Sequence, residues 1–362
     1  MGSLYRSVLK PVFFKMDPET VHERVTSLGK SLGKNRISRS AIHSLYHFEH
    51  PSLRSVVAGI EFLNPIGLGA GFDKNAQLYD ILPDVGFGFA ELGSITAEKC
   101  AGNPKPRLFR LPEDKSIIVN YGLMNDGCEV ISSRLRGTVF RIPIGISVAK
   151  TNDKNLLETE AGIRDYVKAY RHMHPLGMYT TINVSCPNIN DGQTFGHPHN
   201  LRKLLEALNL EKHSKPVFLK LKPDFSEKEI EEIIAIAESY TWVTGFIVSN
   251  LTTHREGLHR SVEELNSLSL KGGLSGLPTQ KRSLDAIRFL HARTSKIIIG
   301  CGGVFNGKDA VEKIKAGASL VQIVTALIFE GPGVVSKINK EVVAILQEEG
   351  CENIDELKKK YH

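Results

Sequence analysis

The segment 183–188, Asn-Val-Ser-Cys-Pro-Asn, places one thiol between two carboxamides, directly after an apolar run that predicts a strand. A cysteine thiolate can remove the proton of an activated C–H bond, so Cys186 is a candidate base. Carboxamides donate and accept hydrogen bonds without titrating, so Asn183, Asn188 and Asn250 suit a small ligand with ureide and carboxylate groups. A single cysteine is more often a small core residue. We assign that role to Cys100, Cys128, Cys301 and Cys351.

A second set of residues suggests a flavin. Lys220 lies inside the apolar run 217–221, and glycine-rich loops occur at 272–276 and 300–303. A lysine at a strand end can place its cation beside the N1/C2=O edge of a flavin, where negative charge develops on reduction. Glycine-rich loops late in an α/β barrel often bind phosphate through backbone N–H groups. The alternatives are a solvated lysine and ordinary tight turns.

The elements that would position these residues follow a strand–helix rhythm. Helical patterns lie at 163–173, 201–210, 227–239, 280–292 and 307–316, between most of eight strand-like apolar runs at 64–69, 88–93, 142–148, 178–184, 216–222, 244–249, 296–300 and 319–323. Eight such units predict an α/β fold, a (β/α)8 TIM barrel, whose active site lies at the carboxyl ends of the strands. A doubly wound sheet is the alternative, weakened because no GxGxxG follows the first strand.

Residues 1–50 form a different region, a small N-terminal helical extension ahead of a barrel at 51–362. An apolar run at 4–16 has near-helical spacing and is interrupted by Pro11, and Asp17-Pro18 reads as the start of a second amphipathic helix. Gly29 and Gly33 suggest where that helix ends. The extension is a packing lid, an interfacial membrane anchor or a ligand funnel, and the residues alone favour the lid.

Composition excludes several classes. The chain has 362 residues with 46 basic and 40 acidic side chains, a net charge of +6. The basic residues are scattered rather than arranged in a stripe, so we expect no nucleic-acid partner, while a weak attraction to anionic lipid stays open. No apolar run reaches the roughly 18 residues of a membrane span. Five cysteines without a CxxC pair favour a reducing compartment, and no residue spacing predicts a metal site.

Taken together, the motifs resemble the dihydroorotate dehydrogenase family over nearly the whole chain. The matching segments, in family order, are GAGFDK (69–74), GNPKPRLFR (102–110), NVSCPN (183–188), GGLSG (272–276) and GASLVQI (317–323). The resemblance implies an enzyme of de novo pyrimidine biosynthesis that uses FMN to oxidise (S)-dihydroorotate to orotate.

The resemblance also implies roles for individual residues. Cys186 would be the base that takes the C5 proton, while N5 of FMN accepts the C6 hydride. The substrate would be bound by Lys74, Asn120, Gly122, Leu123, Asn125, Asn183, Asn188 and Asn250. FMN would be bound by Gly69, Ala70, Gly71, Gly93, Ser94, Ser147, Asn183, Lys220, Ser249, Gly276, Gly302, Gly303, Val324 and Thr325.

The class signals within the family are mixed. The N-terminal segment Asp-Pro-Glu-Thr-Val-His (17–22) is similar to the membrane-associated, quinone-using class, in which His22 and Arg110 would belong to a quinone tunnel. That class normally uses serine as the base, and Cys186 is similar to the soluble class. Val324 and Phe13 stand where more polar tunnel residues are usual.

We therefore expect quinone as the acceptor and peripheral membrane contact through the N-terminal helices. The enzyme would lie at the cytoplasmic face of the membrane in a bacterium, or at the mitochondrial inner membrane in a eukaryote. One alternative is the same half-reaction with a soluble acceptor such as fumarate. Another is a barrel that binds FMN or a phosphate without acting on dihydroorotate.

Three departures from the family pattern bear on the site. Ser147 replaces a customary asparagine, and Leu251 stands where a substrate-binding threonine is expected, with Thr252 as its possible substitute. The segment 119–125 matches the family poorly, which leaves its register open by one residue.

Overall fold

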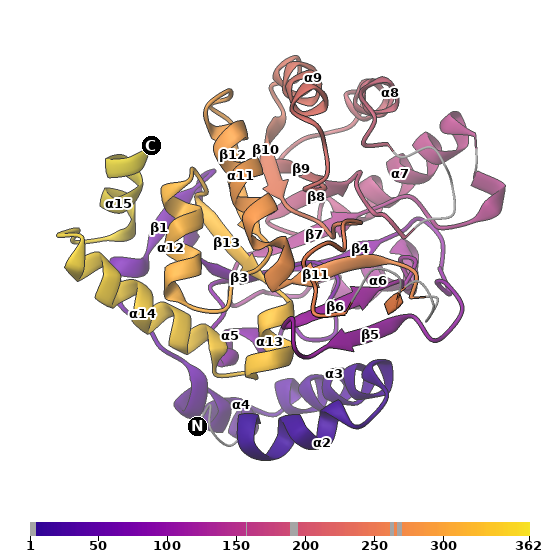
Figure 1. The fold of residues 1–362 in the computed structure, drawn as a ribbon. Coiled ribbons are helices and arrows are strands. Elements are labelled where there is room, and N and C mark those ends of the chain that lie inside the picture. Colours follow the sequence, from indigo (N-terminus) through magenta and orange to yellow (C-terminus); the bar gives the residue numbers. More distant parts are fainter. Residues whose placement is uncertain (1–4, 157, 189–194, 261–263, 266–269) are drawn as a thin grey trace.

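The computed structural model describes residues 5–156, 158–188, 195–260, 264–265 and 270–362. Its centre is a closed barrel of eight parallel strands (Figure 1). Around the barrel these are β3 (Ile66–Leu68), β4 (Phe89–Ile95), β7 (Ile144–Val148), β8 (Tyr179–Asn183), β9 (Val217–Leu221), β10 (Val243–Val248), β12 (Ile297–Cys301) and β13 (Leu320–Ile323). Each overlaps one of the runs predicted from sequence, so the barrel is confirmed. The strands read as continuous apolar runs because both of their faces are buried.

The amino ends of the strands are closed by a hairpin of β1 (Ser55–Val57) and β2 (Ile60–Phe62). Phe62 packs edge-on against Phe89, with 5.3 Å between ring centres. Gly67 and Gly145 make room for rings inside the barrel, since a Cβ at Gly145 would lie 2.0 Å from the ring of Tyr179. Side chains fill this end of the barrel, so a ligand site is expected at the opposite end, where the strands have their carboxyl ends.

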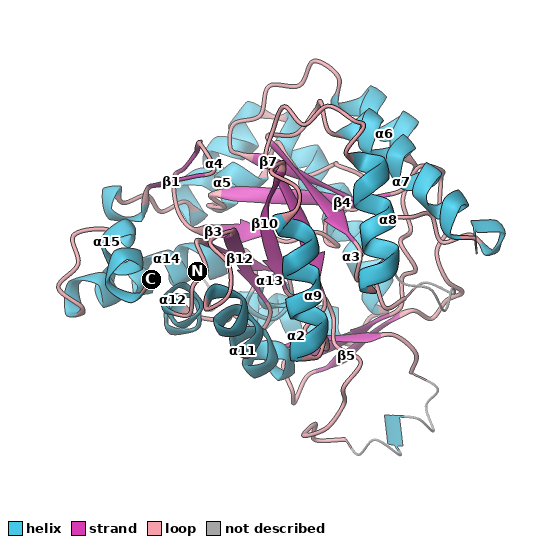
Figure 2. Ribbon diagram, turned by 90° about the horizontal axis from the view of Figure 1, so that it is seen from above, coloured by secondary structure: helices cyan, strands magenta, loops and turns pink. Residues whose placement is uncertain are grey.

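Helices surround the barrel (Figure 2). The five predicted from sequence are confirmed as α7, α8, α9, α11 and α12, and α9 begins with a capping box in which the Ser226 and Glu229 side chains bond each other's backbone. The helices after the extension are α5 (Leu82–Val85), α6 (Cys128–Leu135), α7 (Thr159–Met173), α8 (Pro198–Leu208), α9 (Glu227–Glu238), α11 (Gln280–His291), α12 (Gly307–Lys315), α13 (Thr325–Glu330), α14 (Val334–Glu348) and α15 (Ile354–Tyr361). Short 3-10 turns are η2 (Pro51–Leu53), η3 (Lys154–Leu156) and η4 (Leu277–Thr279).

A three-stranded antiparallel sheet lies over the carboxyl ends of the barrel strands. Its strands are β5 (Leu108–Leu111), β6 (Ser116–Val119) and β11 (Gly273–Gly276), with β6 in the middle. The sequence analysis did not predict this sheet.

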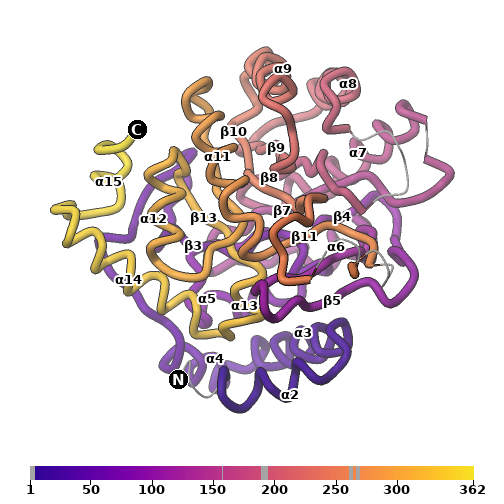
Figure 3. Tube along the Cα trace, in the orientation of Figure 1, coloured from indigo at the N-terminus to yellow at the C-terminus, as the bar shows by residue number. Residues whose placement is uncertain are grey.

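The extension consists of η1 (Tyr5–Leu9), α2 (Lys10–Phe14), α3 (Pro18–Lys34) and α4 (Arg36–Tyr46), and its helices lie side by side along one edge of the barrel (Figures 1 and 3). Asp17 caps α3 as predicted, accepting a 2.8 Å hydrogen bond from the Thr20 N–H. The expectation that Gly29 helps end this helix is wrong, because α3 continues to Lys34. A Cβ at Gly29 would lie 2.7 Å from Leu78 Cδ2, so this glycine allows close packing on the barrel. Leu4, at the start of the apolar run, lies outside the described residues.

A buried ion pair ties the extension to the barrel. The Arg107 guanidinium lies 2.8 Å from the Glu19 carboxylate, and both side chains are about 95% buried. Burial alone would raise the pKa of Glu19, but the hydrogen bonds and charge of Arg107 hold it below its ordinary value. Arg107 also donates to the carbonyls of Ala101 and Asn103, so each nitrogen of the guanidinium has a hydrogen-bond acceptor.

Candidate active site

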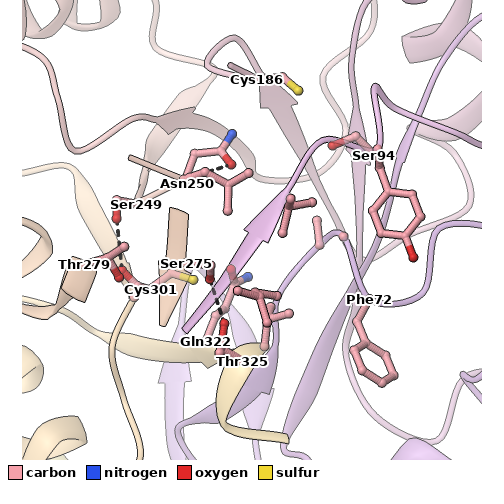
Figure 4. Close-up of a pocket in the computed structure, with 18 of the residues that line it drawn as sticks. Phe72, Ser94, Cys186, Ser249, Asn250, Ser275, Thr279, Cys301, Gln322 and Thr325 are labelled. Carbon is pink, nitrogen blue, oxygen red and sulfur yellow. Dashed lines mark hydrogen bonds between the residues drawn. The ribbon is translucent and has the colours of Figure 1, made fainter. Parts of the chain in front are cut away.

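A cavity opens at the carboxyl ends of the barrel strands and encloses about 1240 Å³ of space free of protein atoms, its mouth included. One side, which we call the polar wall, is formed by strand ends and the loops that follow them. It includes Asn183 and Lys220, together with Ser94, Cys186, Ser249, Asn250 and Thr279, which are labelled in Figure 4. The other side, the apolar wall, is formed by β5, β6, the start of α13 and the loop after β3, and includes Phe72, Leu108, Ile117, Val119, Val324 and Ile328.

Cys186 lies in the loop that follows β8, and this partly buried residue lines the cavity. Burial raises the pKa of this thiol to about 11, partly opposed by the backbone N–H of Asn188. The cysteine of the ligand-free protein is therefore protonated at neutral pH. A base of high pKa is strong once it is deprotonated, but only a small fraction is thiolate at any moment.

The carboxamides next to Cys186 are held by a chain of hydrogen bonds. Asn250 donates to the Oδ1 of Asn183 at 3.1 Å, and Asn183 donates to the Ser94 hydroxyl at 2.8 Å. The Ser94 hydroxyl in turn lies 2.7 Å from the Ser147 hydroxyl. Each amide thus has a fixed orientation before any ligand binds, which is the preorganisation that a binding site needs.

Lys220 is buried in β9, with its Nζ 3.3 Å from the Oε1 of Glu91 on β4. The other carboxylate oxygen of Glu91 accepts hydrogen bonds from Thr181 at 2.9 Å and from Gln322 at 3.1 Å. A buried cation needs a partner of opposite charge, and Glu91 supplies it. The sequence analysis singled out Lys220 and missed Glu91, although a lone carboxylate in the apolar segment Phe-Ala-Glu-Leu-Gly (89–93) is the same signal.

The loop after β12 presents its backbone to the cavity. Gly302 and Gly303 have φ of +113° and +69°, and a Cβ at Gly303 would lie 2.6 Å from the Gln280 Cα. Hydroxyl groups of Thr279 and Thr325 line the same region. Bare backbone, hydroxyls and the buried Lys220 cation fit a phosphate-bearing flavin such as FMN.

Lys74 connects the two walls. It is buried, with its Nζ 3.1 Å from the Nε2 of His22 on α3 and 3.9 Å from the centre of the Tyr121 ring. Burial lowers the pKa of Lys74 to about 8. Burial and the charge of Lys74 lower the pKa of His22 to about 3, so this histidine is neutral. Lys74 therefore changes its charge close to neutral pH, and no carboxylate among the described residues forms an ion pair with it.

Most of the residues predicted for the site do line the cavity. They are His22, Ala70, Gly71, Lys74, Gly93, Ser94, Gly122, Leu123, Asn183, Cys186, Asn188, Lys220, Ser249, Asn250, Gly302, Gly303, Val324 and Thr325. Among the residues that were not predicted, Gln322 and Tyr121 line the cavity, and Glu91 supports it through Lys220.

Six predicted residues lie outside the lining: Gly69, Arg110, Asn120, Asn125, Ser147 and Gly276. Asn125 has its amide engaged by Thr96 and by the Leu123 carbonyl, and the Asn120 Oδ1 accepts from Asn103. Arg110 donates to the carbonyls of Phe13 and Met16, each at 3.0 Å.

The departure at Leu251 also has a structural outcome. Leu251 lines the cavity, whereas Thr252 is buried and donates its hydroxyl to Asp224. In this arrangement Thr252 does not substitute for the missing threonine.

Comparison with known proteins places the chain in a family. The dihydroorotate dehydrogenase family model matches residues 52–346. The chain belongs to the dihydroorotate dehydrogenase family. A Thermosynechococcus vestitus protein named dihydroorotate dehydrogenase (quinone) is 38% identical over 95% of this chain and 98% of its own. A Christiangramia forsetii protein of the same name is 37% identical over 94% and 99%.

Solved structures agree. A crystal structure of DHODH from Eimeria tenella in complex with ferulenol superposes with a TM-score of 0.83 at 30% identity, covering 94% of both chains. The ligand-free form of that protein has a TM-score of 0.80. The resemblance predicted from sequence, including its quinone class, is confirmed. Coverage of 95% means that the match to the first relative includes most of the N-terminal extension.

Proposed function

We propose that this chain oxidises dihydroorotate to orotate with bound FMN and passes the electrons to a quinone. The observation that carries the proposal is the polar wall, where the Cys186 thiol and oriented carboxamides face the same cavity as the buried Lys220 cation. When bound, FMN supplies the acceptor for the hydride from C6 of the substrate and delivers the electrons onward.

The residues of the polar wall bind and deprotonate the substrate. Asn183 and Asn250 hydrogen-bond the ureide, and the Lys74 cation pairs with the carboxylate. The Cys186 thiolate removes the C5 proton, so that the C5–H bond breaks and an S–H bond forms as the C6–H bond breaks and the C5=C6 double bond develops. Because burial raises the pKa of the free thiol to about 11, only a small fraction of Cys186 is thiolate at neutral pH, and the rate of proton removal rises with that fraction.

Lys220 and the glycine loop hold the cofactor. Gly302, Gly303 and Thr325 bind its phosphate, and Lys220 offers positive charge where reduction places negative charge. Glu91 keeps Lys220 in place through the 3.3 Å ion pair.

The apolar wall takes the quinone. Its aliphatic and aromatic side chains suit a flat, weakly polar ring, and His22 and Tyr121 are its polar groups next to Lys74. Quinone pools lie in membranes, so the enzyme works at a membrane surface. Within the described residues no helix has the length and apolar character needed to cross a bilayer. The contact that we propose with the membrane surface is made by exposed apolar side chains of the extension: Val8, Leu9, Val12, Val25, Leu28, Ile37 and Leu45.

Anaerobic addition of dihydroorotate to the yellow holoenzyme tests the proposal. We expect the flavin absorption to bleach, and then to return on addition of a short-chain quinone much faster than on addition of fumarate. Absence of bleaching would favour a barrel that binds flavin without this chemistry. Faster reoxidation by fumarate would replace quinone with a soluble acceptor.

A further inference from the structure

A second, smaller pocket lies outside the active site, between α4 of the extension and the barrel. It encloses about 540 Å³, its open side included, and is lined by Arg36, Arg39, Ser40, His43, Asp84 and Arg141. We call these six residues the basic pocket. Arg36, Arg39, Ser40 and His43 come from one face of α4, whereas Asp84 belongs to α5 and Arg141 to the loop before β7.

The charges in the basic pocket are unequal. Three guanidinium groups face the single carboxylate of Asp84, and Arg141 already holds that carboxylate with hydrogen bonds of 2.6 and 2.7 Å. His43 lies 3.4 Å from the same carboxylate. Asp80 lies nearby, where Arg39 and Arg141 act on its charge, but it does not line the pocket. The carboxylate of Asp84 is thus paired with Arg141, and it forms no ion pair with Arg36 or Arg39.

Within the described residues those two guanidiniums form no ion pair, although the charge of Arg39 acts on nearby Asp80. The side chains of Arg36 and Arg39 make no hydrogen bond or ion pair within the described part of the chain, and the Arg39 Nε is buried without a hydrogen-bond partner. A buried N–H without a partner is costly, and a planar guanidinium is shaped to bind two oxygens of one phosphate. The pocket is therefore built to receive an anion.

The surroundings indicate where that anion comes from. Ile37, between Arg36 and Arg39 in sequence, is 82% exposed, and elsewhere on the extension Leu28 of α3 and Leu45 of α4 are 58% and 45% exposed. Apolar side chains that project beside guanidiniums are typical of a helix at the boundary between lipid headgroups and acyl chains. A site for free phosphate would need no such neighbours.

We propose that the basic pocket binds the phosphate of an anionic phospholipid headgroup, with Ile37 inserted beside it. This inference rests on the proposed membrane contact and adds a specific lipid site to it. Bound in this way to Arg36 and Arg39, a lipid would hold α4 at the membrane and fix how the extension lies on it.

The test uses the full-length holoenzyme and sedimentation with vesicles of phosphatidylcholine alone or mixed in equal parts with phosphatidylglycerol. The variant Arg39→Lys keeps the charge but loses the guanidinium fork. We expect about tenfold weaker binding to the mixed vesicles, the effect of losing one charge-assisted hydrogen bond, and unchanged binding to phosphatidylcholine. Arg24→Lys, an exposed site on α3, is the matched control and should bind as the unmodified protein does.

Equal binding of the two variants to mixed vesicles would overturn the site, because diffuse charge attraction does not distinguish arginine from lysine. Inorganic phosphate at constant ionic strength tests the other source. If it raised the melting temperature of the unmodified protein, and Arg39→Lys abolished that rise, the pocket would bind free phosphate instead of lipid. Dihydroorotate turnover with a short-chain quinone should be the same in both variants. If the unmodified protein showed no turnover of dihydroorotate, the proposed function would be refuted, but the result of the vesicle experiment would still stand.

Discussion

The two walls of the cavity are built on different principles. On the polar wall almost every group has a partner: Asn183 bonds Ser94, Asn250 bonds Asn183, and Glu91 holds Lys220. The apolar wall has few such bonds, and its polar members are His22, which is neutral, and Tyr121 under the Lys74 cation. A reaction that moves a proton needs fixed dipoles, whereas a site for an apolar electron acceptor needs mainly shape.

This difference suggests that the two half-reactions, reduction of the flavin and its reoxidation, can be altered separately. Changes on the polar wall should affect flavin reduction, and changes at the apolar wall or in the extension should affect reoxidation.

Cys186→Ser should slow flavin reduction by dihydroorotate by about 10²–10⁴-fold at neutral pH, since a hydroxyl without a partner base is a much poorer proton acceptor. Stopped-flow absorbance measures this rate. Reoxidation of the dithionite-reduced variant by a short-chain quinone should keep its normal rate. Undiminished reduction by dihydroorotate would mean that Cys186 is not the base.

Glu91→Gln should lower the free energy of unfolding by about 3–5 kcal/mol, because it leaves Lys220 as a buried charge without its partner. Urea denaturation of the apoprotein measures the loss. Glu61→Gln, at an exposed position of β2, serves as the control and should change stability little. A loss for Glu91→Gln no larger than for Glu61→Gln would show that the polar wall does not depend on this pair.

Arg110→Ala should weaken docking of α2 by about 1.5–3 kcal/mol, the worth of hydrogen bonds from a charged donor. Arg110 donates to the Phe13 and Met16 carbonyls where α2 gives way to α3. We expect a higher KM for quinone, with the rate of flavin reduction unchanged. Lys15→Ala, at an exposed position between Phe13 and Met16 in sequence, is the control and should change neither quantity. A slower reductive half-reaction in Arg110→Ala would show that the two walls are coupled.

The pH dependence is the most gradual effect, about tenfold or 1.4 kcal/mol for each pH unit. Below the Cys186 pKa of about 11, the thiolate fraction rises with pH, so flavin reduction at saturating dihydroorotate should speed up from pH 7 to pH 10. Lys74, with a pKa of about 8, loses its charge over this range, so the KM for dihydroorotate should rise above pH 8. A rate that stays flat in this range would mean that bound substrate has already lowered the pKa of Cys186.

The barrel was predictable because each of its strands is buried on both faces and reads as an apolar run. The β5–β6–β11 sheet was not predictable, because β11 pairs with a strand far away in the sequence, Gly273 opposite Val119. A pairing between distant segments leaves no pattern within either segment. The same limit applies within the site. Motifs such as Asn-Val-Ser-Cys-Pro-Asn (183–188) pointed to the polar wall, whereas contacts such as Arg107–Glu19 and Lys220–Glu91 join residues far apart in sequence.

The ion pair between Glu19 and Arg107 also limits how the extension can be exchanged. An unrelated amphipathic helix grafted onto this barrel would cover Arg107 without neutralising it, because that guanidinium is only 5% exposed. A working chimera would have to carry a carboxylate at the position of Glu19, or lose the arginine at the same time. Anyone redesigning the N-terminal extension of this enzyme would therefore have to replace Glu19 and Arg107 together.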